Sequence, residues 1–112
     1  LFPVWLFLNR ELNCMVVVVL KKGAFKPAYI GQLQTYMKVL DDKVRKPHEN
    51  PTIGILLCKS ANKAFVEYVI RDYSHPMGVA TYKTAEDMSE ELRKALPDMD
   101  EMRKLLTDDG DD

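Results

Sequence analysis

The hydrophobic residues of this chain fall into several short runs typical of strands and one longer amphipathic stretch. Residues 16–20 read Val-Val-Val-Val-Leu and are apolar at both alternating sets of positions. Such a run is typical of a strand buried on both faces, at the centre of a sheet that helices cover. The pattern predicts strands at Val4–Asn9, Asn13–Lys21, Thr52–Cys58, Lys63–Ile70 and Met77–Tyr82.

Two longer segments predict helices. Pro27 is well placed as a first helical residue, and from Ile30 to Val44 apolar residues recur every three or four positions, which forms one helix face. A second helix is predicted over Thr84–Leu96, with Thr84 as its N-cap, and a short helical turn follows to about residue 106. The order of the elements predicts an α/β domain with a mixed sheet flanked by helices. We expect one domain over residues 1–106 and a frayed acidic tail over 107–112.

The composition indicates the general class of protein but no particular activity. The 112 residues, 46% hydrophobic and 29% charged, suit one globular domain that needs no disulfide or metal to fold. The two cysteines, Cys14 and Cys58, form no CxxC pair, which argues against structural zinc and a disulfide framework and favours reducing intracellular surroundings. Both are expected to be buried and inert. No apolar stretch approaches the roughly 20 residues of a membrane-spanning helix.

Charge is unevenly distributed along the chain. The net charge of −1 combines a formal +6 over residues 1–83 with −7 over residues 84–112. A basic body with an acidic tail is compatible with an anionic ligand on the body. The simpler alternative, which charge alone favours, is a solvated acidic helix beside an ordinary surface.

Several familiar chemical motifs are absent from the sequence. It contains no GxGxxG, no phosphate-binding P-loop and no GxSxG motif of serine hydrolases. His48 and His75 both lie beside prolines in predicted turns, so we expect surface loop residues rather than ligands or bases.

One constellation does indicate a function. Lys21 ends the central apolar strand, and a helix carrying Gln32 and Tyr36 follows it. Together with the surrounding segments, this resembles the YhcG-type domain of the PD-(D/E)XK nucleases, from about residue 6 to residue 106. The segments that carry the resemblance are Asn9–Cys14, Leu20–Leu33, Asp41–Asp42, Glu49–Lys59 and Val66–Tyr68.

The resemblance implies a restriction-endonuclease-like fold, DNA as the substrate and Mg²⁺ or Mn²⁺ as the family's cofactor. It also implies a bacterial, cytoplasmic protein in which this domain follows an upstream helical region. Because the chain starts with Leu1, we expect it to be a piece of such a longer protein.

The chain departs from the family pattern at the metal ligands. In the family, an Asp in the first strand and a Glu/Asp-Leu-Lys in the second hold the ion and place a lysine beside the attacking water. Val4 stands at the first acidic position and Val19 at the second, whereas Lys21 is retained. Magnesium requires oxygen ligands, which valine lacks. We therefore expect no metal and no cofactor in this copy, and we expect hydrolysis to be lost.

Other residues near Lys21 are candidates for contact with nucleic acid. The resemblance implies that Gln32 positions Lys21 or a phosphate, and that Tyr36, one helical turn away, faces the same cleft. Lys22 and Lys26 are candidates for salt-sensitive phosphate contacts. The plainer alternatives are a boundary role for Gln32, a packing role for Tyr36 and a strand-end lysine with its head in solvent for Lys21.

Three functions remain open from the sequence. The first is a nuclease-family domain that binds DNA with low specificity and no longer cleaves it. The second is a protein-interaction or dimerisation module, in which the acidic segment Glu86–Glu101 and the apolar N-terminal strands contact another subunit or the upstream region. The third is an active enzyme in which an error in the alignment register, or a sequence change, hides the acidic ligand. Phe2–Phe7, however, contains no acidic residue.

Overall fold

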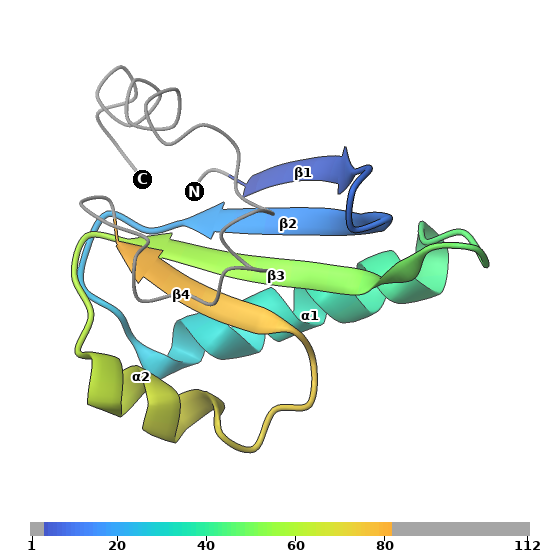
Figure 1. The fold of residues 1–112 in the computed structure, drawn as a ribbon. Helices are drawn as coiled ribbons and strands as arrows, with labels where there is room; N and C mark the ends of the chain where they lie inside the picture. The colour runs from blue at the N-terminus through green and yellow to red at the C-terminus, as the bar shows by residue number, and fades with distance from the viewer. Residues whose placement is uncertain (1–3, 82–112) are drawn as a thin grey trace.

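A computed structural model describes residues 4–81, which form a four-stranded sheet with two helices (Figure 1). The strands lie in the order β1-β2-β3-β4; β1 is antiparallel to β2, while β2, β3 and β4 are parallel. The predicted mixed α/β architecture is therefore confirmed. The elements are β1 (Val4–Asn9), β2 (Cys14–Leu20), α1 (Pro27–Lys43), β3 (Asn50–Cys58), α2 (Lys63–Ile70) and β4 (Met77–Thr81).

Strand β2 is central and buried, as its sequence predicts. It pairs with β1 on one side and β3 on the other, and all of its residues from Val16 to Leu20 are at most 2% exposed. Val17 and Val19 point to the face covered by helices, whereas Val16 and Val18 point to the opposite face. Burial on both faces explains why this strand is apolar at every position rather than at alternate ones.

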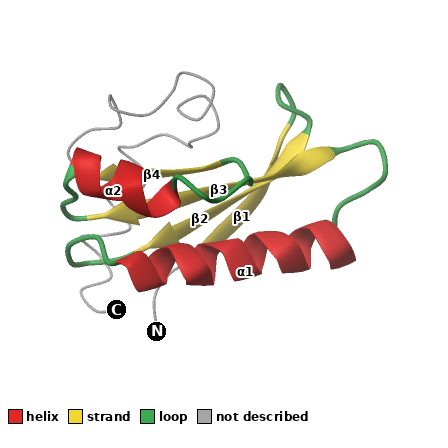
Figure 2. Cartoon of the chain, turned by 90° about the horizontal axis from the view of Figure 1, so that it is seen from below, coloured by secondary structure: helices red, strands yellow, loops and turns green. Residues whose placement is uncertain are grey.

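Both helices contribute to the same side of the sheet. Ile30, Leu33 and Met37 of α1 and Val66 of α2 belong to one buried cluster with Val17 and its neighbours on that face. Figure 2 shows α1 running along the strands. The cluster on the opposite face contains sheet residues together with Trp5, Phe7 and Leu12, and no residue of α1 or α2.

Gly54 of β3 allows α1 to lie close to the sheet. A Cβ atom at this position would be 3.0 Å from Leu33 Cγ and nearer still to Met37 Sδ. Even an alanine here would force the helix or its side chains to shift. The close approach brings the middle of α1 against the middle of β3.

The strand predicted over residues 63–70 is wrong, because this segment is the helix α2. Alternation of apolar residues suggested a strand, but Val66, Val69 and Ile70 also recur at helical spacing and face the helix-side cluster. Asn62 caps the helix, since its side-chain oxygen accepts a hydrogen bond of 3.0 Å from the Phe65 N–H. That residue was the signal for a helix start.

The other predicted elements within residues 4–81 are present with small shifts. Helix α1 begins at Pro27 as expected and ends at Lys43, which leaves Val44 43% exposed rather than on the buried face. Strand β3 begins two residues before the prediction. The predicted helix over 84–96, the turn that follows it and the tail over 107–112 lie outside the described residues. Neither described helix is long and apolar enough to span a membrane.

Candidate nucleic-acid interface

The β1–β2 hairpin places Val4 directly opposite Val19. The register is continuous from this pair to Asn9 and Cys14, without a bulge. Side chains alternate along a strand, so Val19 and the position of Lys21, two residues further on, lie toward the same face. Val19 is fully buried, while Val4 is 40% exposed. The three positions that the resemblance associates with the family site thus lie together at one end of the sheet.

Lys21 is buried at this end of the sheet rather than extended into solvent. The residue is 6% exposed, and its Nζ lies 4.5 Å from the centre of the Tyr29 ring of α1. An ammonium over an aromatic face is stabilised by the ring quadrupole. The Lys21 N–H donates a hydrogen bond of 2.8 Å to the Leu57 carbonyl. The alternative of a lysine head in solvent is therefore wrong.

The described residues around Lys21 do not fit a divalent metal ion. Within residues 4–81, no group of three or more His, Cys, Asp or Glu side chains could hold one. Asp41, at the distant end of α1, accepts hydrogen bonds from the Thr52 N–H and O–H at 2.9 and 2.7 Å. Glu49 accepts one from the Lys46 N–H at 2.8 Å. These carboxylates lie at the opposite end of the sheet from Lys21. Neither is placed to hold a metal ion beside it.

Two loops run side by side where β2 and β3 end. The Lys59 N–H donates to the Gly23 carbonyl at 3.0 Å, and the Phe25 N–H donates to the Ser60 carbonyl at 2.8 Å. Residues 21–26 and 59–62 are thereby held together. They end where α1 and α2 begin, on the left in Figure 1.

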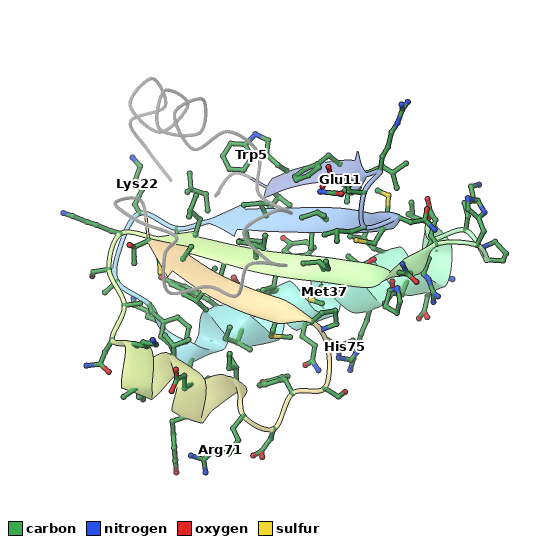
Figure 3. The ribbon with its side chains drawn as sticks, in the orientation of Figure 1. Trp5, Glu11, Lys22, Met37, Arg71 and His75 are labelled. Carbon is green, nitrogen blue, oxygen red and sulfur yellow. The ribbon has the colours of Figure 1, made fainter. Side chains whose placement is uncertain are left out.

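This end of the sheet carries four lysines, on the two loops and at the start of α2. We call Lys22, Lys26, Lys59 and Lys63 the basic edge. Lys22 is partly exposed and the other three are exposed; residues 21–27 and 59–63 contain no acidic residue. Figure 3 shows Lys22 at this end and Glu11 toward the opposite end. The four lysines thus form a mainly positive surface, which Glu67, one turn after Lys63 on α2, partly offsets.

The helix dipoles act in the same direction as the lysines. Both α1 and α2 begin at this end, and neither has an acidic residue in its first turn. The N-terminus of a helix carries a partial positive charge. Each helix therefore adds to the positive potential of the basic edge rather than reducing it.

The structure gives the other candidate residues near Lys21 different surroundings. Gln32 and Tyr36 are both exposed on α1, Tyr36 at 37%, so part of the Tyr36 ring is open to solvent. The residue against the Lys21 ammonium is Tyr29, which the sequence analysis did not single out. Lys59 and Lys63 were also missed. Lys59 follows a predicted strand parallel to β2, and since parallel strands end at the same edge, this position was a usable signal.

The cysteines and one histidine follow expectation. Cys14 and Cys58 are buried, and burial raises the pKa of the Cys58 thiol from 9.0 to about 11. A protonated, buried thiol is a poor nucleophile. His48 lies in an exposed loop, as predicted. His75 is half-buried, and its Nδ1 has no hydrogen-bond partner among the described residues, so its prediction as a surface residue is wrong.

An antiparallel hairpin joined to parallel strands, with a helix across their face and a lysine at the end of the second strand, defines a restriction-endonuclease-like domain. The sequence model described as YhcG PDDEXK nuclease domain matches residues 4–97. The chain belongs to this family.

A curated relative agrees with the family. The chain is 31% identical over 78 residues to the Escherichia coli (strain K12) protein named "Putative nuclease YhcG". The match covers 70% of this chain and 21% of the relative, so the chain spans about a fifth of that protein. No solved structure matches the chain.

Proposed function

We propose that this domain binds DNA through its basic edge and does not hydrolyse it. The observation that carries the proposal is the contrast within one end of the sheet: the lysines are present, whereas valines occupy positions 4 and 19. Membership of a nuclease family makes nucleic acid the expected partner of a basic surface at this place. The proposed activity is binding with low sequence specificity.

Phosphate contact by exposed lysines is the physical basis of the binding. Lysines at phosphates release condensed counterions, so the affinity falls steeply as salt increases and depends little on base sequence. The buried Lys21 has a different role, because its Nζ lies over the Tyr29 ring. We assign it as a retained remnant of the family site and keep Gln32 as a candidate neighbour of the bound strand.

Loss of hydrolysis follows from the chemistry of the side chains at the family's ligand positions. Hydrocarbon at Val4 and Val19 offers no lone pairs, so a divalent ion there lacks the anchoring oxygens it requires. Burial of an apolar side chain of this size also stabilises the fold, by about 1.5–3 kcal/mol when complete. Val19, with no exposed surface, gains this in full.

The test measures binding and cleavage in the same samples. A labelled duplex is titrated with the protein by fluorescence anisotropy over a series of salt concentrations, with Mg²⁺ or Mn²⁺ present, and each sample is then run on a denaturing gel. We expect affinity that falls with salt and no cleavage products. Robust turnover that Lys21→Ala abolishes would refute the loss of catalysis, and the absence of salt-sensitive binding would refute the DNA-binding role.

A second candidate function is self-association through β1. This strand lies at the edge of the described sheet, and Val4, Leu6 and Leu8 are 40%, 47% and 48% exposed. The whole strand, VWLFLN, contains no charged residue. Edge strands of this kind are templates for pairing with another chain unless charges, prolines or bulges interrupt them. An antiparallel pair of β1 strands from two copies would cover these side chains.

The second candidate makes a separate prediction. Sedimentation over a range of protein concentrations would show a dimer that Leu6→Lys converts to a monomer. A monomer at all concentrations, with intact DNA binding, favours the first function alone. The cytoplasmic location and the contact with an upstream helical region remain proposals that accompany both.

A further inference from the structure

Helix α2 exposes two aromatic rings beside the basic edge. Phe65 is 46% exposed and Tyr68 is 68% exposed, and they lie one helical turn apart. Large aromatic side chains are more often buried in the core. Both rings on this eight-residue helix therefore leave much of their surface outside the core.

The Phe65 ring packs against an aromatic ring of the core. It makes an edge contact with the buried Phe25 ring, with centroids 6.0 Å apart and planes at 79°. Its backbone N–H is bound by the side chain of Asn62. The ring can therefore receive a flat ligand without losing much conformational freedom on binding, which favours affinity.

The same contacts place Phe65 among the lysines. Lys26 follows Phe25 directly in the chain, and Lys59 precedes Ser60, whose carbonyl accepts the Phe25 N–H. Lys63 is in the first turn of α2. Lysines thus lie on the same segments that meet beside this exposed ring.

Two other residues of α2, Tyr68 and Glu67, bear on which ring can stack on a base. The Arg71 guanidinium lies 5.3 Å from the centre of the Tyr68 ring and occupies one of its faces. Glu67 is exposed and negatively charged, but two residues along a helix point in nearly opposite directions, so Glu67 does not lie beside Phe65. Phe65 is accordingly the ring best placed for a base.

We propose that the basic edge binds single-stranded DNA, with the Phe65 ring stacked on an unpaired base. This rests on the proposed DNA binding and adds the class of strand. Aromatic stacking combined with a positively charged track is the general mode by which proteins bind single strands, because every base presents a π-face. In a duplex the bases are already stacked on each other, so Phe65 contributes little and the lysines alone act.

The experiment compares two probes and two variants. An oligothymidine of about 20 nucleotides exceeds the usual site of about 4–16 nucleotides, and a duplex of equal length carries the same label. In EDTA at low salt, we expect Phe65→Leu to weaken binding of the single strand about tenfold and of the duplex less than about twofold. Val39→Ala, at a residue of similar exposure in the second half of α1, is the matched control and should change neither.

A second variant reports on stacking directly and does not depend on lost packing. The chain has one tryptophan, Trp5, so Trp5→Phe combined with Phe65→Trp leaves a single indole at the site. We expect the single strand to quench its fluorescence and the duplex to leave it unchanged. Equal effects of Phe65→Leu on both probes, or no quenching, would overturn the inference while duplex binding stands. If the unmodified protein binds neither probe, the proposed function itself fails.

Discussion

The two ends of the central sheet are built in opposite ways. At the end where β2 and β3 terminate, the four lysines of the basic edge and the starts of both helices come together without an acidic residue in the two connecting loops. At the other end, the β1–β2 turn and the loop after α1 are joined by hydrogen bonds from Asn13 and Asn50, at 2.7–2.9 Å, and carry charges of both signs.

This difference supports the proposal that one end serves stability and the other serves binding. Polar groups at the second end satisfy one another: Glu49 accepts a hydrogen bond from the Lys46 N–H, and Asp41 accepts two from Thr52. At the first end, four lysines lie on two adjoining loops and the start of α2, which raises the local positive potential. A surface on which one sign of charge gathers is typical of a binding site for the opposite charge.

Restoring carboxylates at the basic end should produce the largest effect. We expect Val4→Asp with Val19→Glu to raise Mn²⁺-dependent DNA cleavage at least about a hundredfold above the unmodified protein, because a bound ion stabilises the charge that develops in the reaction. The measurement is single-turnover cleavage of labelled DNA. The control is the pair Val4→Asn with Val19→Gln, which has the same shape as the acidic pair but no carboxylate. Equal activity in both variants would show that cleavage does not depend on the carboxylates.

Charge reversal should distinguish the two ends by affinity. Lys26→Glu with Lys59→Glu should weaken DNA binding about a hundredfold at low salt and reduce the slope of log affinity against log salt by about 2. The same change at Lys43 and Lys46, exposed at the other end, should cost less than about threefold. Anisotropy titrations measure both. Equal losses at the two ends would mean that the basic edge has no special role.

At the other end, a change should act on stability instead. Asp41→Ala leaves the buried N–H and hydroxyl of Thr52 without their acceptor, and we expect the free energy of unfolding to fall by about 1.5–3 kcal/mol. The neighbouring Asp42, which is exposed, gives the control: Asp42→Ala should cost less than about 0.5 kcal/mol. Urea denaturation measures this, and DNA affinity should not change in either variant.

At high pH, the titration of a core thiol should also act on stability. Burial raises the pKa of Cys58 from 9.0 to about 11, so folding favours the neutral thiol. Its contribution to stability is complete below pH 9 and is lost as the pH rises toward 11. The unfolding free energy of the unmodified protein should therefore fall more steeply over this range than that of Cys58→Ala. If the unfolding free energies of the two proteins changed in parallel with pH, the raised pKa of Cys58 would be contradicted.

Much of the fold could be predicted from local sequence. The continuous apolar run of β2 marked the central strand, and Pro27 marked the start of α1, because each signal is local. Helix α2 was mistaken for a strand, since an eight-residue apolar segment satisfies both periodicities and only its Asn62 cap distinguishes them.

Less of the candidate site than of the fold could be predicted from the sequence. Lys21 and the paired valines followed from the family resemblance, and the continuous β1–β2 register places those positions together. The contact between Lys21 and Tyr29, and the meeting of Lys59 with the loop after β2, depend on how α1 and β3 pack. Such contacts join residues that are distant along the chain, so a periodic pattern contains no information on them.

A crystal soaked in Mn²⁺ and measured at the manganese absorption edge would give the most decisive result. If valines have replaced the carboxylates of a former metal site, no anomalous peak appears among Val4, Val19 and the Lys21 ammonium, even at concentrations that saturate an active relative. A peak at this place, with carboxylate oxygens at about 2.0–2.2 Å supplied from another part of the chain, would contradict the loss of the site and of hydrolysis.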